Sequence, residues 1–368
     1  MNQESYRKLI SGQSSGAPAV LLRFFLGVAA QVYSIIIRLR NLLYSKGRLK
    51  THSVNAAVIS VGNITAGGTG KTPLVIWLCN KITQNLKLKT QNYRCAILTR
   101  GYKATQNLKL KTKNYSDEPA ILAKSCSEAK IIVKPNRVVG AAEAVNKFGA
   151  KVVIMDDGFQ HQRLDRDLDI VTIDAMCPFG YDKMLPAGLL REPVSALKRA
   201  GAVVITRCNQ IAEARLVKLE EKIKSVNADM IIAKSIHTPI CAKSLERKEI
   251  SIEKLKSKKI FAFCGIGNPD AFLGTIKELG LNLAGSKIYN DHYYYTDNDI
   301  TDIYAQAGRS NADLILSTQK DWTKTALLAS AKKEIPFAYL AIELKFVSEE
   351  DKITQLIEDT LAGKIPKK

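Results

Sequence analysis

The sequence predicts an α/β protein with a mainly parallel sheet, and three observations support this prediction. Short apolar segments, of the kind that form buried strands, alternate with segments of helical character along most of the chain. A glycine-rich turn, residues 65–72, follows the first of these apolar segments and precedes a helical one. The chain of 368 residues, 46% apolar and 24% charged, is long enough for two globular domains. We therefore expect a sheet with helices on both faces and a smaller second α/β domain.

The N-terminal segment, residues 17–44, is strongly apolar, and basic residues follow it. A secretory signal peptide would place its charges before the apolar part. Arg23 and Gln31 fall inside the segment and disfavour a helix that spans a bilayer. We expect an amphipathic helix in a membrane interface; a helix packed on the protein's own core and a true span are the alternatives. The weaker positions step by three or four and form one narrow stripe: Arg23, Gly27, Gln31, Ser34, Arg38, Asn41 and Ser45.

The balance of charge favours an anionic partner. The chain has 55 basic and 35 acidic residues, a formal net charge of +20. Nucleic acid, an anionic membrane and a phosphorylated substrate would all suit this charge. Aromatic residues are not interleaved with the basic ones, so we expect no nucleic acid partner. The seven cysteines form no C-x-x-C pair, which makes a zinc site improbable and favours reduced thiols in the cytosol.

The expected elements divide the chain into three parts. Residues 1–50 would form the membrane-associated helix, residues 51–220 a nucleotide-binding domain, and residues 221–368 a smaller C-terminal α/β domain. The expected strands are 56–61, 95–99, 152–155, 169–173, 202–206, 260–264, 286–289 and 314–317, and the expected helices are 73–82, 118–125, 138–148 and 270–279.

One short segment is duplicated. "TQNLKLKTQNY" at residues 83–93 recurs as "TQNLKLKTKNY" at residues 105–115, with ten of eleven positions identical. One such pair does not make a repeat fold, which needs three or more stacked units. We interpret the copies as two surface insertions, which a fold tolerates at little cost. The alternative is a basic arm that contacts lipid head groups.

The glycine-rich turn has most of a phosphate-binding loop, the pattern G-x-x-x-x-G-K-[ST]. Gly70, Lys71 and Thr72 supply its last three positions, and Thr65 stands where its first glycine would be. Such a loop follows a buried strand, exposes backbone amides and opens a helix whose N-terminus faces the anion. We therefore expect a P-loop NTPase-like fold that binds ATP. Lys71 would reach the β- and γ-phosphates and Thr72 would bind Mg²⁺. The nucleotide would be held by Gly67, Gly68, Thr69, Gly70, Lys71 and Thr72.

Two aspartates follow another expected strand, in "KVVIMDDGFQH". They stand at its carboxyl end, where open α/β sheets bind their ligands. We expect one of Asp156 and Asp157 to position Mg²⁺, directly or through water, and the sequence leaves open which one. The alternative is an ordinary acidic turn.

With these residues, the chain resembles the tetraacyldisaccharide 4'-kinase family, the lipid A 4'-kinases. The matching strings run in order from Ser60 to Asp321 and cover most of the chain. The resemblance implies transfer of phosphate from ATP to the 4'-hydroxyl of an acylated disaccharide 1-phosphate. It also implies a membrane-associated N-terminal helix and a loop with the same shape at position 65, whereas the duplicated insertions look foreign to the family. The strings are "SVGNITAGGTGKTP", "TRGYK", "SDEPAILA", "MDDGFQHQRLDRDLDIVTID", "LPAGLLREP", "FCGIGNP", "NDHYYYTDND" and "STQKD".

The resemblance also implies roles for individual residues. Asp117 of "SDEP" is our choice of catalytic base, and by resemblance it pairs with His292 of "NDHYYY", while Lys71 neutralises phosphate charge. Because these two motifs lie far apart in sequence, the C-terminal domain would close over the first one and exclude water. Candidates for contacts with the substrate are Arg100, Tyr102, His161 and Arg191, with Arg137 as a weaker one and Tyr293, Tyr294 and Tyr295 as sugar-stacking, interfacial or core residues.

The expected cofactors are ATP and Mg²⁺, and the expected partners are the lipid substrate and the inner membrane surface. We expect a monomer on the cytoplasmic face of the inner membrane, bound peripherally or monotopically. Two other classes of protein remain as hypotheses: a nucleic-acid-dependent P-loop ATPase and a membrane-peripheral nucleotide-binding protein without enzymatic activity. The apolar N-terminal helix would be unexplained in the first class.

Overall fold

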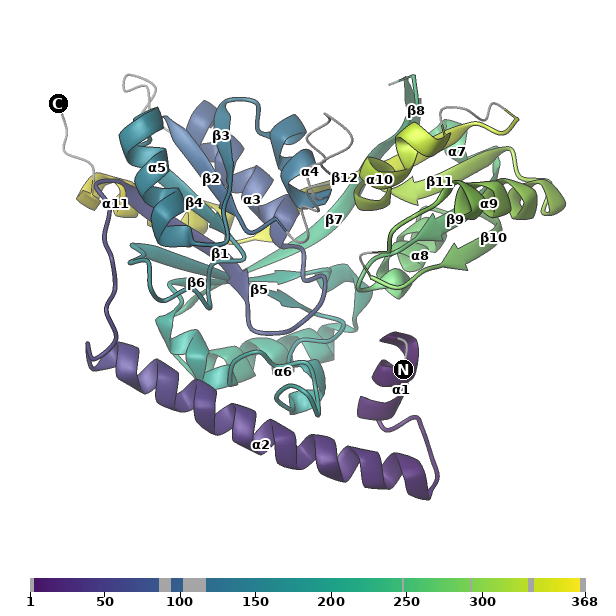
Figure 1. Cartoon of the computed structure of the whole chain (residues 1–368). Coiled ribbons are helices and arrows are strands. Elements are labelled where there is room, and N and C mark those ends of the chain that lie inside the picture. The colour runs from purple at the N-terminus through teal and green to yellow at the C-terminus, as the bar shows by residue number, and fades with distance from the viewer. Residues whose placement is uncertain are drawn as a thin grey trace. The chain divides into compact units, whose positions relative to one another are not determined.

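The computed structural model describes residues 3–85, 94–101, 117–246, 248–291, 293–329 and 334–364 (Figure 1). Within these ranges the side chains of residues 3, 4, 84, 85, 117, 118 and 327 are not described. The chain forms two compact units. We call Ser5–Ile236 with Leu344–Lys368 the loop unit, because it contains the glycine-rich turn, and Met1–Glu4 with His237–Glu343 the tyrosine unit. Residues 344–368 thus belong with the loop unit, and the three domains expected from the sequence stay a prediction.

The loop unit is built on a parallel sheet in the order β7-β6-β5-β1-β4-β2-β3. The central strand β1 lies between β4 and β5, with Ala57 opposite Val152 and Ile59 opposite Leu168. The expected parallel sheet is confirmed, and β3 and β7 are strands that we did not expect. The strands are β1 (Ala57–Asn63), β2 (Cys95–Thr99), β3 (Ala129–Val133), β4 (Val152–Asp156), β5 (Leu168–Asp174), β6 (Ala202–Thr206) and β7 (Ile231–Ser244).

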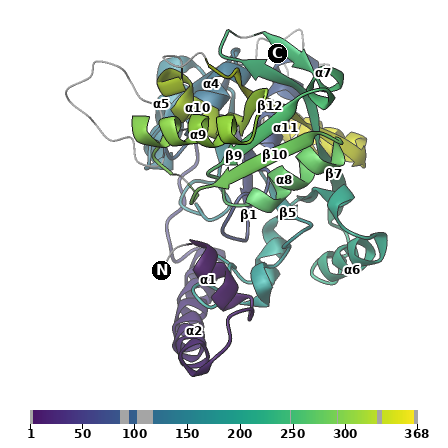
Figure 2. The ribbon, with the colours of Figure 1, turned by 90° about the vertical axis from the view of Figure 1, so that its right-hand side faces the viewer.

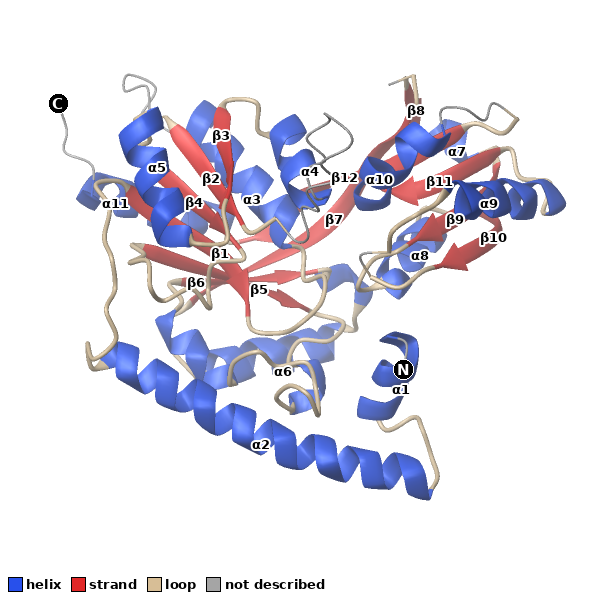
Figure 3. Ribbon diagram, in the orientation of Figure 1, coloured by secondary structure: helices blue, strands red, loops and turns tan. Residues whose placement is uncertain are grey.

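Helices cover both faces of this sheet, as expected (Figure 3). One face packs against α3 (Lys71–Asn80), α4 (Asp117–Ser125) and α11 (Glu350–Lys364). The other packs against α5 (Arg137–Phe148) and α6 (Glu213–Lys224). Alternate residues of each strand point to opposite faces, so the buried strands join two apolar layers. Short helical turns are η1 (Lys81–Asn85), η3 (Gly180–Asp182), η4 (Val194–Arg199) and η5 (Cys208–Gln210). Apart from Thr83–Asn85, the duplicated segments lie outside the described residues.

Two helices precede the sheet, α1 (Gln3–Ile10) and the long α2 (Ala17–Ser45), both visible in Figure 2. Within the described part of the chain, α2 is the one helix long and apolar enough to cross a membrane by length and composition. Only Ala30, Ser34 and Ile37 of this helix are buried. Its large exposed apolar residues are Val20, Leu21, Leu22, Phe24, Phe25, Val28, Val32, Ile35, Ile36, Leu39 and Leu42.

The tyrosine unit has a parallel sheet of its own, in the order β10-β9-β11-β12. Helix α8 packs on one face with α7, and α9 and α10 pack on the other. The strands β7 and β12 each have residues in both units, and β8 pairs with β7 in antiparallel fashion. The elements are β8 (Glu249–Ser251), α7 (Ile252–Lys256), β9 (Lys259–Cys264), α8 (Pro269–Glu278), β10 (Asn282–Ile288), α9 (Asp297–Arg309), β11 (Leu314–Thr318), α10 (Gln319–Ala329) and β12 (Phe337–Ser348).

A cluster of three tyrosines gives this unit its name. The ring centroid of Tyr289 lies 4.6 Å from that of Tyr293 and 5.0 Å from that of Tyr295. The Tyr295 hydroxyl donates to the buried Asp321 carboxylate at 2.9 Å, and the Thr318 hydroxyl donates to the same group at 2.6 Å. Burial raises the pKa of Asp321 although these donors oppose the shift.

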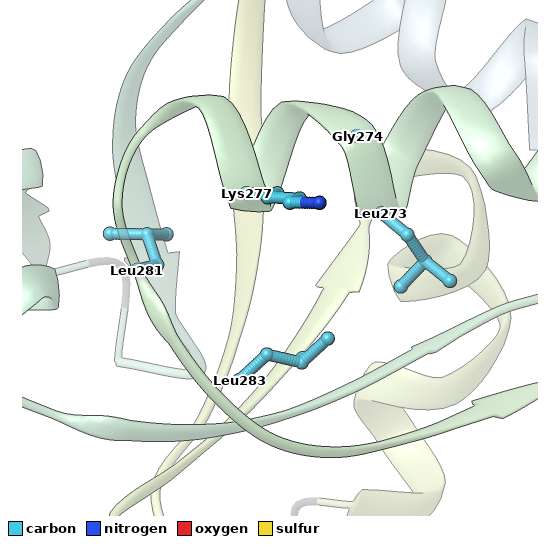
Figure 4. A pocket seen from close by; sticks show the side chains of 5 residues that line it. All are labelled: Leu273, Gly274, Lys277, Leu281 and Leu283. Atoms are coloured by element: carbon cyan, nitrogen blue, oxygen red, sulfur yellow. The ribbon is translucent and has the colours of Figure 1, made fainter.

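The tyrosine unit also contains a pocket of about 360 Å³ (Figure 4). Helix α8 and the start of β10 line it with aliphatic side chains, and Lys277 is its one charged residue. Neither a carboxylate nor a histidine lines it, so we assign it no catalytic role. The lining residues are Leu273, Gly274, Lys277, Leu281 and Leu283.

Candidate active site

The glycine-rich turn connects β1 to α3, as a phosphate loop must. Gly67 and Gly70 have positive φ angles of 118° and 83°, a backbone region that costs other residues strain. Gly70 is the N-cap residue of α3, whose first two residues are Lys71 and Thr72. Among the residues that the structure describes, none outside the chain neighbours of Gly68 has an atom within 4 Å of the position that a β-carbon would take there. The loop is therefore open beside Gly68 and ends at a helix N-terminus, which fits the phosphates of ATP.

Thr69 anchors the loop to three strand ends. Its hydroxyl accepts a hydrogen bond from Asn63 Nδ2 at 2.9 Å and shares one with the Thr172 hydroxyl at 2.8 Å. Its carbonyl accepts from the Thr206 hydroxyl at 3.0 Å. Asn63 is the last residue of β1, Thr172 lies near the end of β5, and Thr206 is the last residue of β6. The Thr69 hydroxyl thus faces the protein, and only the backbone of this residue is left to serve a nucleotide.

A buried ion pair is hydrogen-bonded to the backbone of the loop. Arg207 Nη2 lies 2.5 Å from Asp174 Oδ2 and donates to the Gly68 carbonyl at 2.6 Å. Asp174 ends β5, and Arg207 directly follows β6. Both side chains are almost fully buried, so each charge is stabilised by the opposite charge of its partner, and removal of either one would leave a buried charge uncompensated. Neither residue was predicted from the sequence as part of the site, although each stands at the carboxyl end of an expected strand.

The two aspartates after β4 point to different partners. Asp157, at a positive φ of 55°, is bonded in bidentate fashion by Arg191, with distances of 2.9 and 3.1 Å. Lys71 Nζ lies 3.5 Å from the same carboxylate. Burial opposes ionisation here, but the charges of Lys71 and Arg191 outweigh it and hold the pKa of Asp157 well below its usual range. Asp156 is buried instead, and its carboxylate accepts from the Thr99 hydroxyl at 3.2 Å.

Ionised carboxylate oxygen and a threonine hydroxyl are ligands that suit Mg²⁺. Asp157 lies next to Lys71 at the loop, and Thr72 follows Lys71 at the start of α3. These residues fit a magnesium ion with ATP. The expectation that one of Asp156 and Asp157 positions the ion stays a prediction.

Arg191 and His161 come together around Asp157. Arg191 Nη1 also donates to Asn63 Oδ1 at 3.1 Å, which links it to the start of the loop. Burial lowers the pKa of His161 to about 4, and the neighbouring charge of Arg137 acts in the same direction. The imidazole is therefore neutral near pH 7. Arg137 is buried and donates to the Asp156 carbonyl at 2.9 Å, so it supports the aspartate turn.

Other candidate residues are placed less completely. Arg100 follows β2 with an exposed side chain, and its charge also acts on His161. Asp117 begins α4, but its side chain is not described. Tyr102 and His292 lie outside the described residues. The pairing of Asp117 with His292 therefore stays a prediction.

Comparison with known proteins agrees with this geometry. The family model LpxK, described as tetraacyldisaccharide-1-P 4'-kinase, matches residues 22–362. The tetraacyldisaccharide 4'-kinase of Halothermothrix orenii is 34% identical over an alignment of 346 positions, and the match covers 87% of this chain and 88% of the relative. The enzyme of the same name from Syntrophotalea carbinolica is 33% identical over an alignment of 378 positions, and the match covers 96% of this chain and 98% of the relative.

A solved structure matches as well. The crystal structure of LpxK from Aquifex aeolicus in complex with ATP has a TM-score of 0.68 and 28% sequence identity, and the match covers 92% of this chain and 99% of that one. The resemblance in the sequence is thus confirmed at the level of both sequence and fold. The chain belongs to the tetraacyldisaccharide 4'-kinase family.

Proposed function

We infer that this chain transfers the γ-phosphate of ATP to the 4'-hydroxyl of a tetraacylated disaccharide 1-phosphate in lipid A biosynthesis. The single observation that carries this inference is the family match over residues 22–362, which includes the loop and the aspartate turn. The geometry agrees with it, because an open phosphate loop lies beside an ionised aspartate and two cations. The chain is an ATP-dependent kinase with an alcohol acceptor.

The loop residues bind and orient the nucleotide. The amides of Gly67, Gly68, Thr69 and Gly70 and the N-terminus of α3 would hold the phosphates, and Lys71 would turn from Asp157 toward their charge. Thr72 and one of Asp156 and Asp157 would hold Mg²⁺, which would supply positive charge that neutralises the phosphates. Arg191 keeps Asp157 oriented through its two parallel hydrogen bonds.

Asp117 is our proposed catalytic base. A base has to receive the proton of the 4'-hydroxyl while its oxygen attacks phosphorus. A carboxylate paired with the His292 imidazole would serve, since the histidine can orient it and tune its pKa. Support comes from the "SDEP" and "NDHYYY" motifs and from the start of α4 at Asp117. Closure of the C-terminal domain over the first would exclude water and limit hydrolysis of ATP.

The substrate would be held by Arg100, Tyr102, His161 and Arg191. The neutral His161 imidazole can donate and accept hydrogen bonds from sugar hydroxyls without a charge of its own. Arginines at this end of the sheet suit the phosphate group of an anionic lipid. These assignments rest on position within the family motifs.

We propose that α2 holds the enzyme on the cytoplasmic face of the inner membrane, as a monomer. Its exposed residues include Phe24, Phe25, Ile35 and Ile36, with between 58% and 65% of each residue accessible to water. Exposure of so many large apolar side chains to water is unfavourable, and their burial in a lipid interface would stabilise the bound protein. Removal of residues 1–45 should release the protein from vesicles. Unchanged sedimentation with vesicles would contradict the interfacial role of α2.

Product analysis tests the proposed function. The full chain, MgATP and the disaccharide 1-phosphate lipid in detergent should give a product that is heavier by one phosphate. Phosphorus–proton correlation by NMR should place that phosphate on the 4' oxygen. A phosphate on any other position, or an unmodified lipid beside hydrolysed ATP, would contradict the function.

A further inference from the structure

The protein-facing side of α2 is hydrogen-bonded to residues next to the active site. Asn41 uses both ends of its amide: Nδ2 donates to Glu192 Oε2 at 2.8 Å, and Oδ1 accepts from Gln162 Nε2 at 2.7 Å. About two turns closer to the N-terminus of α2, the Tyr33 hydroxyl donates to the Arg191 carbonyl at 3.0 Å. These bonds connect α2 to two loops that are far from it in sequence.

Glu192 is the centre of this contact. It is completely buried, and its carboxylate accepts from Arg199 Nη2 at 3.0 Å. Arg40 of α2 approaches the same carboxylate at 3.5 Å. A buried carboxylate is stable only when charges and donors surround it. Helix α2 supplies two of these partners, Arg40 and Asn41.

Both loops that α2 contacts carry residues of the candidate site. Arg191, which directly precedes Glu192, holds Asp157 and Asn63. Gln162 directly follows His161. A shift of α2 would therefore move Glu192 and Gln162 and, with them, the groups around the Asp157 carboxylate.

We propose that Asn41 is a positioning residue, which sets the orientation of Arg191 through Glu192 and so couples the seating of α2 to catalysis. The two faces of α2 then have separate tasks. The apolar face binds the lipid surface, and the polar face holds the loops at 162 and 191–192 in their active arrangement. The proposal rests on the proposed kinase function and adds a role for the interior side of the membrane helix.

The test compares Asn41→Ala with Ser45→Ala, which changes an exposed residue one turn along the same helix whose hydroxyl donates to the Leu42 carbonyl of α2 itself. Because Asn41→Ala removes a hydrogen bond to the charged Glu192, we expect the kcat of this variant to fall about tenfold. The KM for the lipid and the binding to phosphatidylglycerol vesicles should stay within about twofold, and Ser45→Ala should match the unmodified chain. A role in stability alone would leave kcat of the folded variant unchanged.

A normal kcat in folded Asn41→Ala, or a loss of vesicle binding equal to the loss of activity, would overturn the proposal. If Asn41→Ala does not fold, Tyr33→Phe keeps the ring and removes only the bond to the Arg191 carbonyl. We expect its kcat to fall about threefold, with an unchanged KM for the lipid, and an unchanged kcat would again overturn the proposal. The unmodified chain has to phosphorylate the lipid in the same assay, which separates failure of this proposal from failure of the proposed function.

A different observation supports a second inference, on α1. Most of this helix belongs to the loop unit and is fixed within it: the Tyr6 hydroxyl donates to the Pro186 carbonyl at 2.8 Å, and Leu9 and Ile10 are buried. Arg7, next to Tyr6, brings its guanidinium to the phosphate loop. A β-carbon placed on Gly67 would lie 3.8 Å from Arg7 Nη2. Residues 1–21 precede the range that the family model matches, so family membership implies no role for Arg7.

We also infer that Arg7 contacts the terminal phosphate of ATP beside Gly67. An arginine brought to a transferred phosphate stabilises the charge that spreads over its oxygens. Arg7→Ala should weaken ATP binding about tenfold and leave ADP binding within about twofold, as measured by titration calorimetry. The exposed neighbour Lys8, changed to alanine, serves as the control. An equal loss for ATP and ADP, or no loss for either, would overturn this inference.

Discussion

Asp157 in the loop unit is partly buried and Asp321 in the tyrosine unit fully buried, and the surroundings of the two carboxylates differ in charge. Lys71 and Arg191 contact the Asp157 carboxylate, and they keep its pKa low although burial opposes this. Asp321 accepts from the hydroxyls of Thr318 and Tyr295, and burial raises its pKa. The first arrangement places a carboxylate and two cations next to the phosphate loop. The second connects β11, α10 and the tyrosine cluster.

This difference separates a chemical site from a structural one. An ionised carboxylate that shares its cations with a loop can exchange partners when phosphate and metal arrive. A carboxylate that is bonded by neutral hydroxyls shares no cation with a phosphate site. Its hydrogen bonds instead rigidify the polar network around it. Substitutions near Asp157 should therefore change catalysis most, and substitutions near Asp321 should change stability.

Lys71→Ala should give the largest effect. Loss of the cation that reaches the β- and γ-phosphates should lower kcat about a thousandfold, because a charged group in a preorganised site is worth about 10²–10³ in rate. Steady-state transfer to the lipid measures it, with the exposed Lys8→Ala as a matched control of charge. A kcat within tenfold of the unmodified chain would mean that the loop does not bind the transferred phosphate.

Asp117→Ala should come next and separates chemistry from nucleotide binding. A general base contributes about 10²–10⁴ in rate, so transfer should fall at least about a hundredfold while the affinity for ATP stays nearly unchanged. Calorimetric titration with ATP beside the transfer assay measures both. Near-normal turnover would show that another group accepts the proton.

The two aspartates should change the pH dependence of stability in opposite directions. The folded pKa of Asp157 lies below the unfolded value of about 3.9, so the free energy of unfolding falls as pH drops through that value. Burial raises the folded pKa of Asp321 above the unfolded value of about 3.9. The contribution of this residue to the free energy of unfolding is therefore complete below the unfolded value and is lost as pH rises through the folded pKa. Urea denaturation of Asp157→Asn and Asp321→Asn over a range of pH should show each slope removed. The same slope change in both variants would contradict the comparison.

His161 should give the smallest effect. Its folded pKa of about 4 lies below the ordinary value of 6.5, so the unfolded chain binds the proton first as pH falls. The free energy of unfolding should therefore decrease between about pH 6.5 and about pH 4. His161→Gln should flatten the profile in this window, and denaturation midpoints measure it. An unchanged profile would mean that the imidazole titrates normally in the folded state.

Local sequence was enough for the phosphate loop, the aspartate turn and the central strands. The loop at Gly67–Thr72 and the turn at Asp156–Asp157 each consist of neighbouring residues whose chemistry can be read in one short string. The central strands were found because they are apolar on both faces, as in any buried parallel sheet. The family motifs then supplied the substrate.

The parts that were missed depend on long-range contacts. Strand β7 contains Pro239, which disfavours a strand when neighbouring strands are unknown. Helix α11 returns from the C-terminus to pack on β1, and its sequence does not name that partner. The pair Asp174–Arg207 forms between residues on separate strands, and only the fold brings them to Gly68. The polar stripe of α2 was recognised, but its contact with Glu192 was not.

Transfer of label from γ-phosphate-labelled ATP tests the central claim most directly. The full chain in detergent should move the label into the tetraacyl disaccharide 1-phosphate, with little release of free phosphate when the lipid is withheld. Label that appears only as inorganic phosphate, at the same rate with and without the lipid, would contradict the account.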